Sequence, residues 1–191
     1  MKKTVFPTII LGVLLLAAFP CMTACSGPSS APSEQSQKQQ SKHARQLPVM
    51  NLTSSNKGDV KFADVCDSKA IIIDVWASWC GPCCKQIPIL HELKDKYGSR
   101  LAIVGISVDD SEKDHKKAIK KLKINYPSCL AKDNINAQYL DDLQKATGQR
   151  IEGIPHLVIA DGKGNIVYAR SGVHSKKHLE KILDPLMKTK N

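Results

Sequence analysis

From residue 47 onward, apolar and polar positions follow two different periods. Residues 69–77 and 101–109 are continuous apolar runs, which are typical of strands buried on both faces of a sheet. Residues 80–97 instead carry apolar side chains at helical spacing, and Gly98 follows as a stop signal. The apolar positions of this helix are Ile87, Leu90, Leu93 and Tyr97. This strand-helix-strand order predicts an α/β domain.

Two hairpins and three further helices complete the expected order. The turn residues 55–58 and 162–165 each separate two short strand patterns. The expected hairpin strands are residues 47–53 with 59–62 and residues 156–161 with 166–172. Helices are expected over 111–123, over 134–147 and after the capping residue Ser175, with a short strand over 126–131. The result is a central mixed sheet flanked by helices.

The N-terminus has the pattern of an export signal. Two lysines precede the apolar run 5–19, which is shorter than the roughly 20 residues that cross a bilayer. Met22-Thr23-Ala24-Cys25 then resembles a bacterial lipobox. We expect residues 1–24 to be a signal peptide and Cys25 to carry a lipid. Because Met22 replaces the commoner leucine, a soluble exported form and an uncleaved anchor stay open.

Composition separates a tether from the folded domain. Residues 25–46 are mostly Ser, Gln, Lys and Pro and have too few apolar side chains to fold, so we expect a flexible tether before a domain over 47–191. The net charge is +10, yet aromatic residues are only 5% and an exported protein meets no genome. We therefore expect solvated basic helix faces and no nucleic-acid partner, with anionic lipid or an acidic partner left open.

Three cysteines, Cys80, Cys83 and Cys84, lie at or near the start of the expected helix 80–97. A thiolate at a helix N-terminus faces free backbone N–H groups, which lower its pKa, so Cys80 is the expected nucleophile. Cys83, one turn on, is placed to close a disulfide with it, because an i,i+3 pair approaches more closely than an i,i+4 pair. Cys84 has either a passive packing role or an auxiliary redox role. No second cysteine pair follows, so no metal site is expected.

Further residues give this pattern a family resemblance. The segment Trp-Cys-Gly-Pro-Cys is followed by Pro88, and Asp74 lies six residues before its first cysteine. Further along the chain, the dipeptide Ile154-Pro155 leads into a strand. Together these resemble thioredoxin. The hairpin before the first long strand and the strand-helix insert are more similar to the exported TlpA/ResA-type branch, and the Glu-Gly-Ile-Pro segment is similar to tryparedoxin. The resemblance covers residues 47–191 and implies a thioredoxin-like fold.

The resemblance also implies roles for site residues. Pro155 would be a catalytic cis-proline beside the cysteines, and the Ile154 backbone would pair with substrate. The remaining expected substrate-binding residues are Trp79, Gly81 and Pro82. Asp74 would accept the proton of Cys83, unless it is an acid that reaches solvent at a strand end.

Two positions depart from the resembled families. TlpA/ResA-type proteins often place an acid on the helix, where this chain has Gln86. His156 stands where the family often has Thr, and we expect a surface histidine, with a titrating role left open.

These features predict a membrane-tethered protein-disulfide oxidoreductase in the bacterial cell envelope, facing the periplasm or exterior. It would reduce or isomerise exported disulfide proteins, without a cofactor, and draw electrons from a membrane thiol-disulfide donor. The alternative is a Sco-type copper metallochaperone, since Cys80 and Cys84 have its thiolate spacing. A peroxiredoxin-type peroxidase is disfavoured, because Ala77 replaces the Thr or Ser required three residues before the cysteine.

Overall fold

The structure, a computed structural model, describes residues 45–132 and 134–188, so the expected signal peptide, Cys25 and nearly all of the tether lie outside the described residues. The strands are β1 (Asn51–Ser54), β2 (Gly58–Lys61), β3 (Ala70–Trp76), β4 (Leu101–Ser107), β5 (Ser128–Leu130), β6 (His156–Asp161) and β7 (Ile166–Ser171). The α-helices are α1 (Gly81–Tyr97), α2 (Glu112–Lys121), α3 (Asn134–Thr147) and α4 (Lys176–Lys188). The order of elements is the one expected from the sequence.

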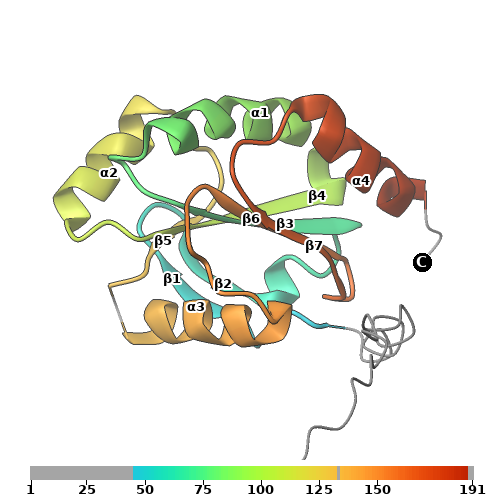
Figure 1. Cartoon of the computed structure of the whole chain (residues 1–191), viewed down its shortest axis with the longest axis horizontal. Coiled ribbons are helices and arrows are strands. Elements are labelled where there is room, and N and C mark those ends of the chain that lie inside the picture. Colours follow the sequence, from blue (N-terminus) through green and yellow to red (C-terminus); the bar gives the residue numbers. More distant parts are fainter. Residues whose placement is uncertain (1–44, 133, 189–191) are drawn as a thin grey trace, which may run out of the picture. The chain divides into compact units, whose positions relative to one another are not determined.

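The seven strands form one mixed sheet in the order β2-β1-β5-β4-β3-β6-β7. β3, β4 and β5 run parallel, and every other pairing is antiparallel. Helices α1, α2 and α4 cover one face and α3 covers the other (Figure 1). The expected central mixed sheet flanked by helices is therefore confirmed.

β3 lies between β4 and β6 in the sheet, and all seven of its residues are buried. Ile72 and Trp76 pack into the core beneath α1, α2 and α4, while Ile71 and Ile73 pack into the core beneath α3. Alternate side chains of a strand point to opposite faces, so Asp74 faces the same side as Ile72 and Trp76. This places the one acid of the strand under α1.

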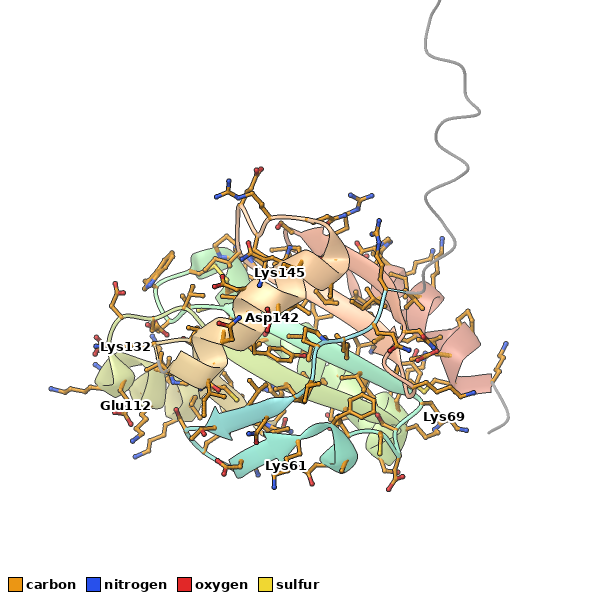
Figure 2. The ribbon with its side chains drawn as sticks, turned by 90° about the horizontal axis from the view of Figure 1, so that it is seen from below. Lys61, Lys69, Glu112, Lys132, Asp142 and Lys145 are labelled. Atoms are coloured by element: carbon orange, nitrogen blue, oxygen red, sulfur yellow. A yellow bond between two sulfur atoms is a disulfide. The ribbon has the colours of Figure 1, made fainter. Side chains whose placement is uncertain are left out.

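The single helix on the second face is attached through a buried amide. The side chain of Asn136 on α3 accepts a hydrogen bond from the Thr53 backbone N–H and donates one to the Thr53 carbonyl, both at 3.0 Å. On the outer side of α3 the charged residues are exposed, including the ion pair of Asp142 and Lys145 at 2.9 Å (Figure 2). The helix predicted for residues 134–147 thus packs against β1 and β5.

Backbone pairing begins slightly before the expected start of the domain. The Ile166 N–H donates to the Arg45 carbonyl at 2.6 Å, and Gln46 bridges to Asn165. At the other end, the Ser175 hydroxyl accepts a hydrogen bond from the His178 N–H at 3.3 Å, as a helix cap does.

Among the described residues, no helix combines the length and the apolar character that crossing a membrane requires.

Candidate active site around the Cys80–Cys83 disulfide

A disulfide joins Cys80 and Cys83 at the start of α1, with 5.2 Å between their Cα atoms. Cys80 is the N-cap residue, and its sulfur accepts a hydrogen bond from the Cys83 backbone N–H at 3.1 Å. This contact and the helix dipole would stabilise a thiolate at Cys80 after reduction. Cys80 keeps 5% exposure whereas Cys83 has none, so Cys80 is the sulfur nearer to solvent.

The loop before β6 lies against this disulfide. The peptide bond between Ile154 and Pro155 is cis, and the Ile154 carbonyl oxygen lies 3.7 Å from the Cys80 sulfur. The Pro155 carbonyl accepts a hydrogen bond from the Gly172 N–H at 2.8 Å, which ties the loop to the end of β7. The dipeptide expected beside the cysteines is therefore there.

The expected substrate-binding residues form the outer rim of the site. Trp79 is 68% exposed, and Gly81 and Pro82 are also exposed. A groove of about 280 Å³ lies beside Trp79, between the cis-proline loop and α3. Its apolar lining consists of Val75, Trp79, Val108, Leu140, Ile151 and Ile154. Such a surface can take an extended peptide next to the disulfide.

Asp74 is buried, with 1% exposure, so the alternative of an acid reaching solvent at a strand end is wrong. Its Oδ1 atom has no hydrogen-bond partner, and the Tyr126 hydroxyl donates to Oδ2 at 3.4 Å. Burial raises the pKa of this carboxyl to about 7, while the Tyr126 hydrogen bond lowers it. A carboxyl that titrates near neutral pH can both take and release a proton.

Gln86 and His156 are both buried. The Gln86 side chain accepts a hydrogen bond from the His174 N–H at 2.6 Å. The expectation of a surface histidine at residue 156 is wrong, because His156 is 1% exposed and its Nδ1 contacts the Ser171 hydroxyl at 2.8 Å. Burial lowers the pKa of His156, with a smaller contribution from nearby His174. Its partner Ser171 lies opposite His156 in the antiparallel pairing of β6 and β7, a contact that the local sequence does not show.

Sequence reasoning missed Asp109, which holds the loop before the disulfide. Its carboxylate accepts hydrogen bonds from the Ser78 N–H at 3.0 Å, the Ser78 hydroxyl at 2.7 Å and the Ser107 hydroxyl at 2.6 Å. A signal was available, because Asp109 follows β4 just as Cys80 follows β3. The carboxyl ends of adjacent parallel strands meet at one edge of the sheet, where sites form.

The other three described cysteines are free thiols. The Cys84 sulfur is half-buried and lies 4.0 Å from the Ser78 carbonyl oxygen. Cys129 is buried on the α3 side of the sheet, where desolvation raises its pKa to about 12. Cys66 is half-buried near the Ala63 carbonyl. None of these three cysteines is bonded to Cys80 or Cys83.

A buried acid on the face of the sheet below a Cys-x-x-Cys disulfide, on a thioredoxin-like fold, defines a thiol-disulfide exchange site. Residues 40–184 match the family model described as Redoxin, and the chain belongs to that family. The expected resemblance to thioredoxin-like oxidoreductases of the TlpA/ResA type is thus confirmed.

Curated relatives carry names of this class. The chain is 29% identical over 119 residues to "Thioredoxin-like protein YneN" of Bacillus subtilis, an alignment covering 61% of this chain and 64% of YneN. It is 23% identical over 151 residues to "Thiol-disulfide oxidoreductase ResA" of Bacillus cereus, covering 78% of this chain and 81% of ResA. The chain thus spans slightly less than two thirds of YneN.

Solved structures share the fold. A thiol:disulfide interchange protein of the thioredoxin family from Chlorobium tepidum aligns with a TM-score of 0.62 at 24% identity, covering 74% of this chain and 95% of that one. A thiol:disulfide interchange protein from Bacteroides sp. aligns with a TM-score of 0.55 at 26% identity, covering 73% and 88%. These likenesses support the thioredoxin-like fold expected for residues 47–191.

Proposed function

We propose that this protein is an exported, membrane-tethered thiol-disulfide oxidoreductase that reduces or isomerises protein disulfides through Cys80 and Cys83. The observation that carries the proposal is the Cys80–Cys83 disulfide at the N-terminus of α1, beside the cis-proline loop. The names of the relatives support the same class of enzyme. Anchoring through Cys25 and the cell-envelope location rest on the N-terminal sequence pattern.

The reaction starts from the reduced protein. The Cys80 thiolate attacks one sulfur of a substrate disulfide and releases the other substrate half as a thiolate. Asp74 then takes the proton of Cys83, and the Cys83 sulfur attacks Cys80. The enzyme disulfide forms, and the second substrate half leaves reduced. A membrane thiol-disulfide donor would return two electrons to the Cys80–Cys83 pair.

The residues between the cysteines favour reduction or isomerisation over oxidation. Gly81 and Pro82 form the dipeptide of thioredoxin, whose couple lies near −270 mV, against about −120 mV for the oxidant DsbA. Substrates would be exported proteins with exposed disulfides. Their extended segments would pair with the Ile154 backbone and contact Trp79, Gly81 and Pro82.

Cysteine variants test the assigned order of attack. In the full chain, Cys80→Ser should abolish disulfide reduction, measured by insulin precipitation with dithiothreitol as donor. Cys83→Ser should instead accumulate mixed disulfides with substrate, because the resolving thiol is missing. The matched control is Cys84→Ser, which removes a neighbouring thiol and should do neither. Equal trapping by the Cys80 and Cys83 variants would contradict the proposed roles.

A further inference from the structure

Tyr126 is the one residue whose side chain makes a hydrogen bond to Asp74 within the described part of the chain. The tyrosine lies just before β5, 52 residues from Asp74 in sequence, and is 3% exposed. Its hydroxyl is 3.4 Å from Oδ2, and Oδ1 is left without a partner. The two oxygens of this buried carboxyl therefore have different surroundings.

Gly105 makes this contact possible. It is the β4 residue paired with Asp74 in the parallel ladder. A Cβ atom at this position would lie 3.3 Å from the Tyr126 ring, 3.1 Å from the Trp76 indole nitrogen and 3.2 Å from the Ser128 hydroxyl. Because these distances are tighter than ordinary van der Waals contact, a side chain at residue 105 would push against the ring. The absence of one leaves room for the tyrosine beside the acid.

The N-terminal hairpin fixes the backbone that carries the tyrosine. The Asn56 side chain, in the turn between β1 and β2, donates to the Tyr126 carbonyl at 3.1 Å and accepts from the Ser128 N–H at 2.9 Å. The Pro127 carbonyl between them accepts from the Gly105 N–H at 2.8 Å. These three hydrogen bonds hold residues 126–128 against both the hairpin and β4.

The groups near Asp74 come from the two neighbouring strands, from α1 and from Tyr126. Its strand neighbours are Gly105 on β4 and Leu157 on β6, neither of which titrates. From α1, Cys83 lies in the same buried cluster as Tyr126, and the His91 ring meets the Tyr126 ring edge-on at 6.0 Å. The pKa of Tyr126 is held well above its usual value by burial and by Asp74, so the phenol keeps its proton.

We propose that Tyr126 is a positioning residue for proton transfer: its hydroxyl holds Oδ2 of the ionised Asp74, and Oδ1 receives the proton of Cys83. This inference rests on the proposed function of Asp74. The Cys83 proton moves to Oδ1, the Cys83 sulfur attacks the Cys80 sulfur, and the electron pair of the broken bond leaves on the substrate sulfur. Tyr126 donates a hydrogen bond throughout and transfers no proton.

The test compares two isosteric variants of the full chain. Tyr126→Phe deletes only the hydroxyl, and the matched control Tyr139→Phe deletes a buried hydroxyl that has no partner, in the opposite core. Single-turnover reduction of a symmetric peptide disulfide separates attack by Cys80 from resolution by Cys83. Losing a hydrogen bond that favours the ionised acid should raise the midpoint of the pH profile for resolution by about 0.5 to 1 pH unit. Near pH 7, resolution should slow about two- to fivefold, and attack by Cys80 should be unchanged.

A second measurement follows the titration of the Asp74 carboxyl in the absence of thiol-disulfide exchange. The Asp74 carboxyl carbon, followed by NMR in the oxidised full chain labelled with ¹³C-aspartate, should titrate at higher pH in Tyr126→Phe but not in Tyr139→Phe. Asn56→Ala keeps the phenol but releases its backbone, and it should shift the titration in the same direction by a smaller amount. An unchanged titration in Tyr126→Phe would overturn the positioning role. If the carboxyl titration shifts but Asp74→Asn resolves at the normal rate and pH, the proposed function of Asp74 fails instead.

Discussion

Replacing Asp74 with asparagine should change how the free energy of unfolding depends on pH. The Asp74 carboxyl has a pKa of about 7 in the folded protein and 3.8 as its ordinary value, which we take for the unfolded chain. Between these values the folded protein binds more protons than the unfolded chain, so this group lowers stability as pH rises. Its stabilising contribution is complete below pH 4 and lost above pH 7.

The size of the effect follows from the two pKa values. At about 1.4 kcal/mol for each pH unit, the interval from 3.8 to about 7 corresponds to about 4 kcal/mol. Asparagine does not ionise and removes this dependence. The difference in unfolding free energy, Asp74→Asn minus wild type, should therefore become about 4 kcal/mol more positive between pH 4 and pH 8.

Urea denaturation of the oxidised full chain at several pH values measures this difference. Exposed thiols are alkylated first, so that they do not exchange with the Cys80–Cys83 disulfide. Asp109→Asn is the matched control, because it changes a buried carboxylate whose oxygens already accept hydrogen bonds from Ser78 and Ser107. At pH 7 it should destabilise the fold by about 1 to 3 kcal/mol, because an amide cannot accept all of these hydrogen bonds. Parallel stability curves for wild type and Asp74→Asn would refute the raised pKa.

Two further predictions concern the remaining cysteines. Cys84→Ser should leave the reduction potential and turnover almost unchanged, because Cys84 is a free thiol outside the Cys80–Cys83 disulfide and its sulfur lies 4.0 Å from the Ser78 carbonyl oxygen. A substantial Cys80–Cys84 or Cys84–Cys129 bond in peptide maps of the oxidised protein would contradict this passive role. Cys25→Ala should move the protein from the membrane fraction to the soluble fraction or stall its processing, since the expected tether has no other apolar anchor. Palmitate labelling that persists in the variant would exclude lipidation at Cys25.

Local sequence patterns predicted the helices, the strands and the disulfide pair. Continuous apolar runs predicted β3 and β4, and helical spacing predicted α1, because these signals come from neighbouring residues. The pairing of Cys80 with Cys83 also depends on local geometry, three residues apart at a helix start. The burial of Asp74 followed from the apolar run around it.

The residues that surround this site from distant parts of the chain could not be predicted in the same way. Tyr126 reaches Asp74 across 52 residues, and Asp109 holds Ser78 across 31, through contacts that have no sequence period. His156 was expected at the surface, yet it is buried and lies opposite Ser171 of β7. Sheet order and register bring such residues together, and the space left by Gly105 determines which side chain meets the acid. Residue type and local periodicity carry none of that information, because it arises only when separate strands pair.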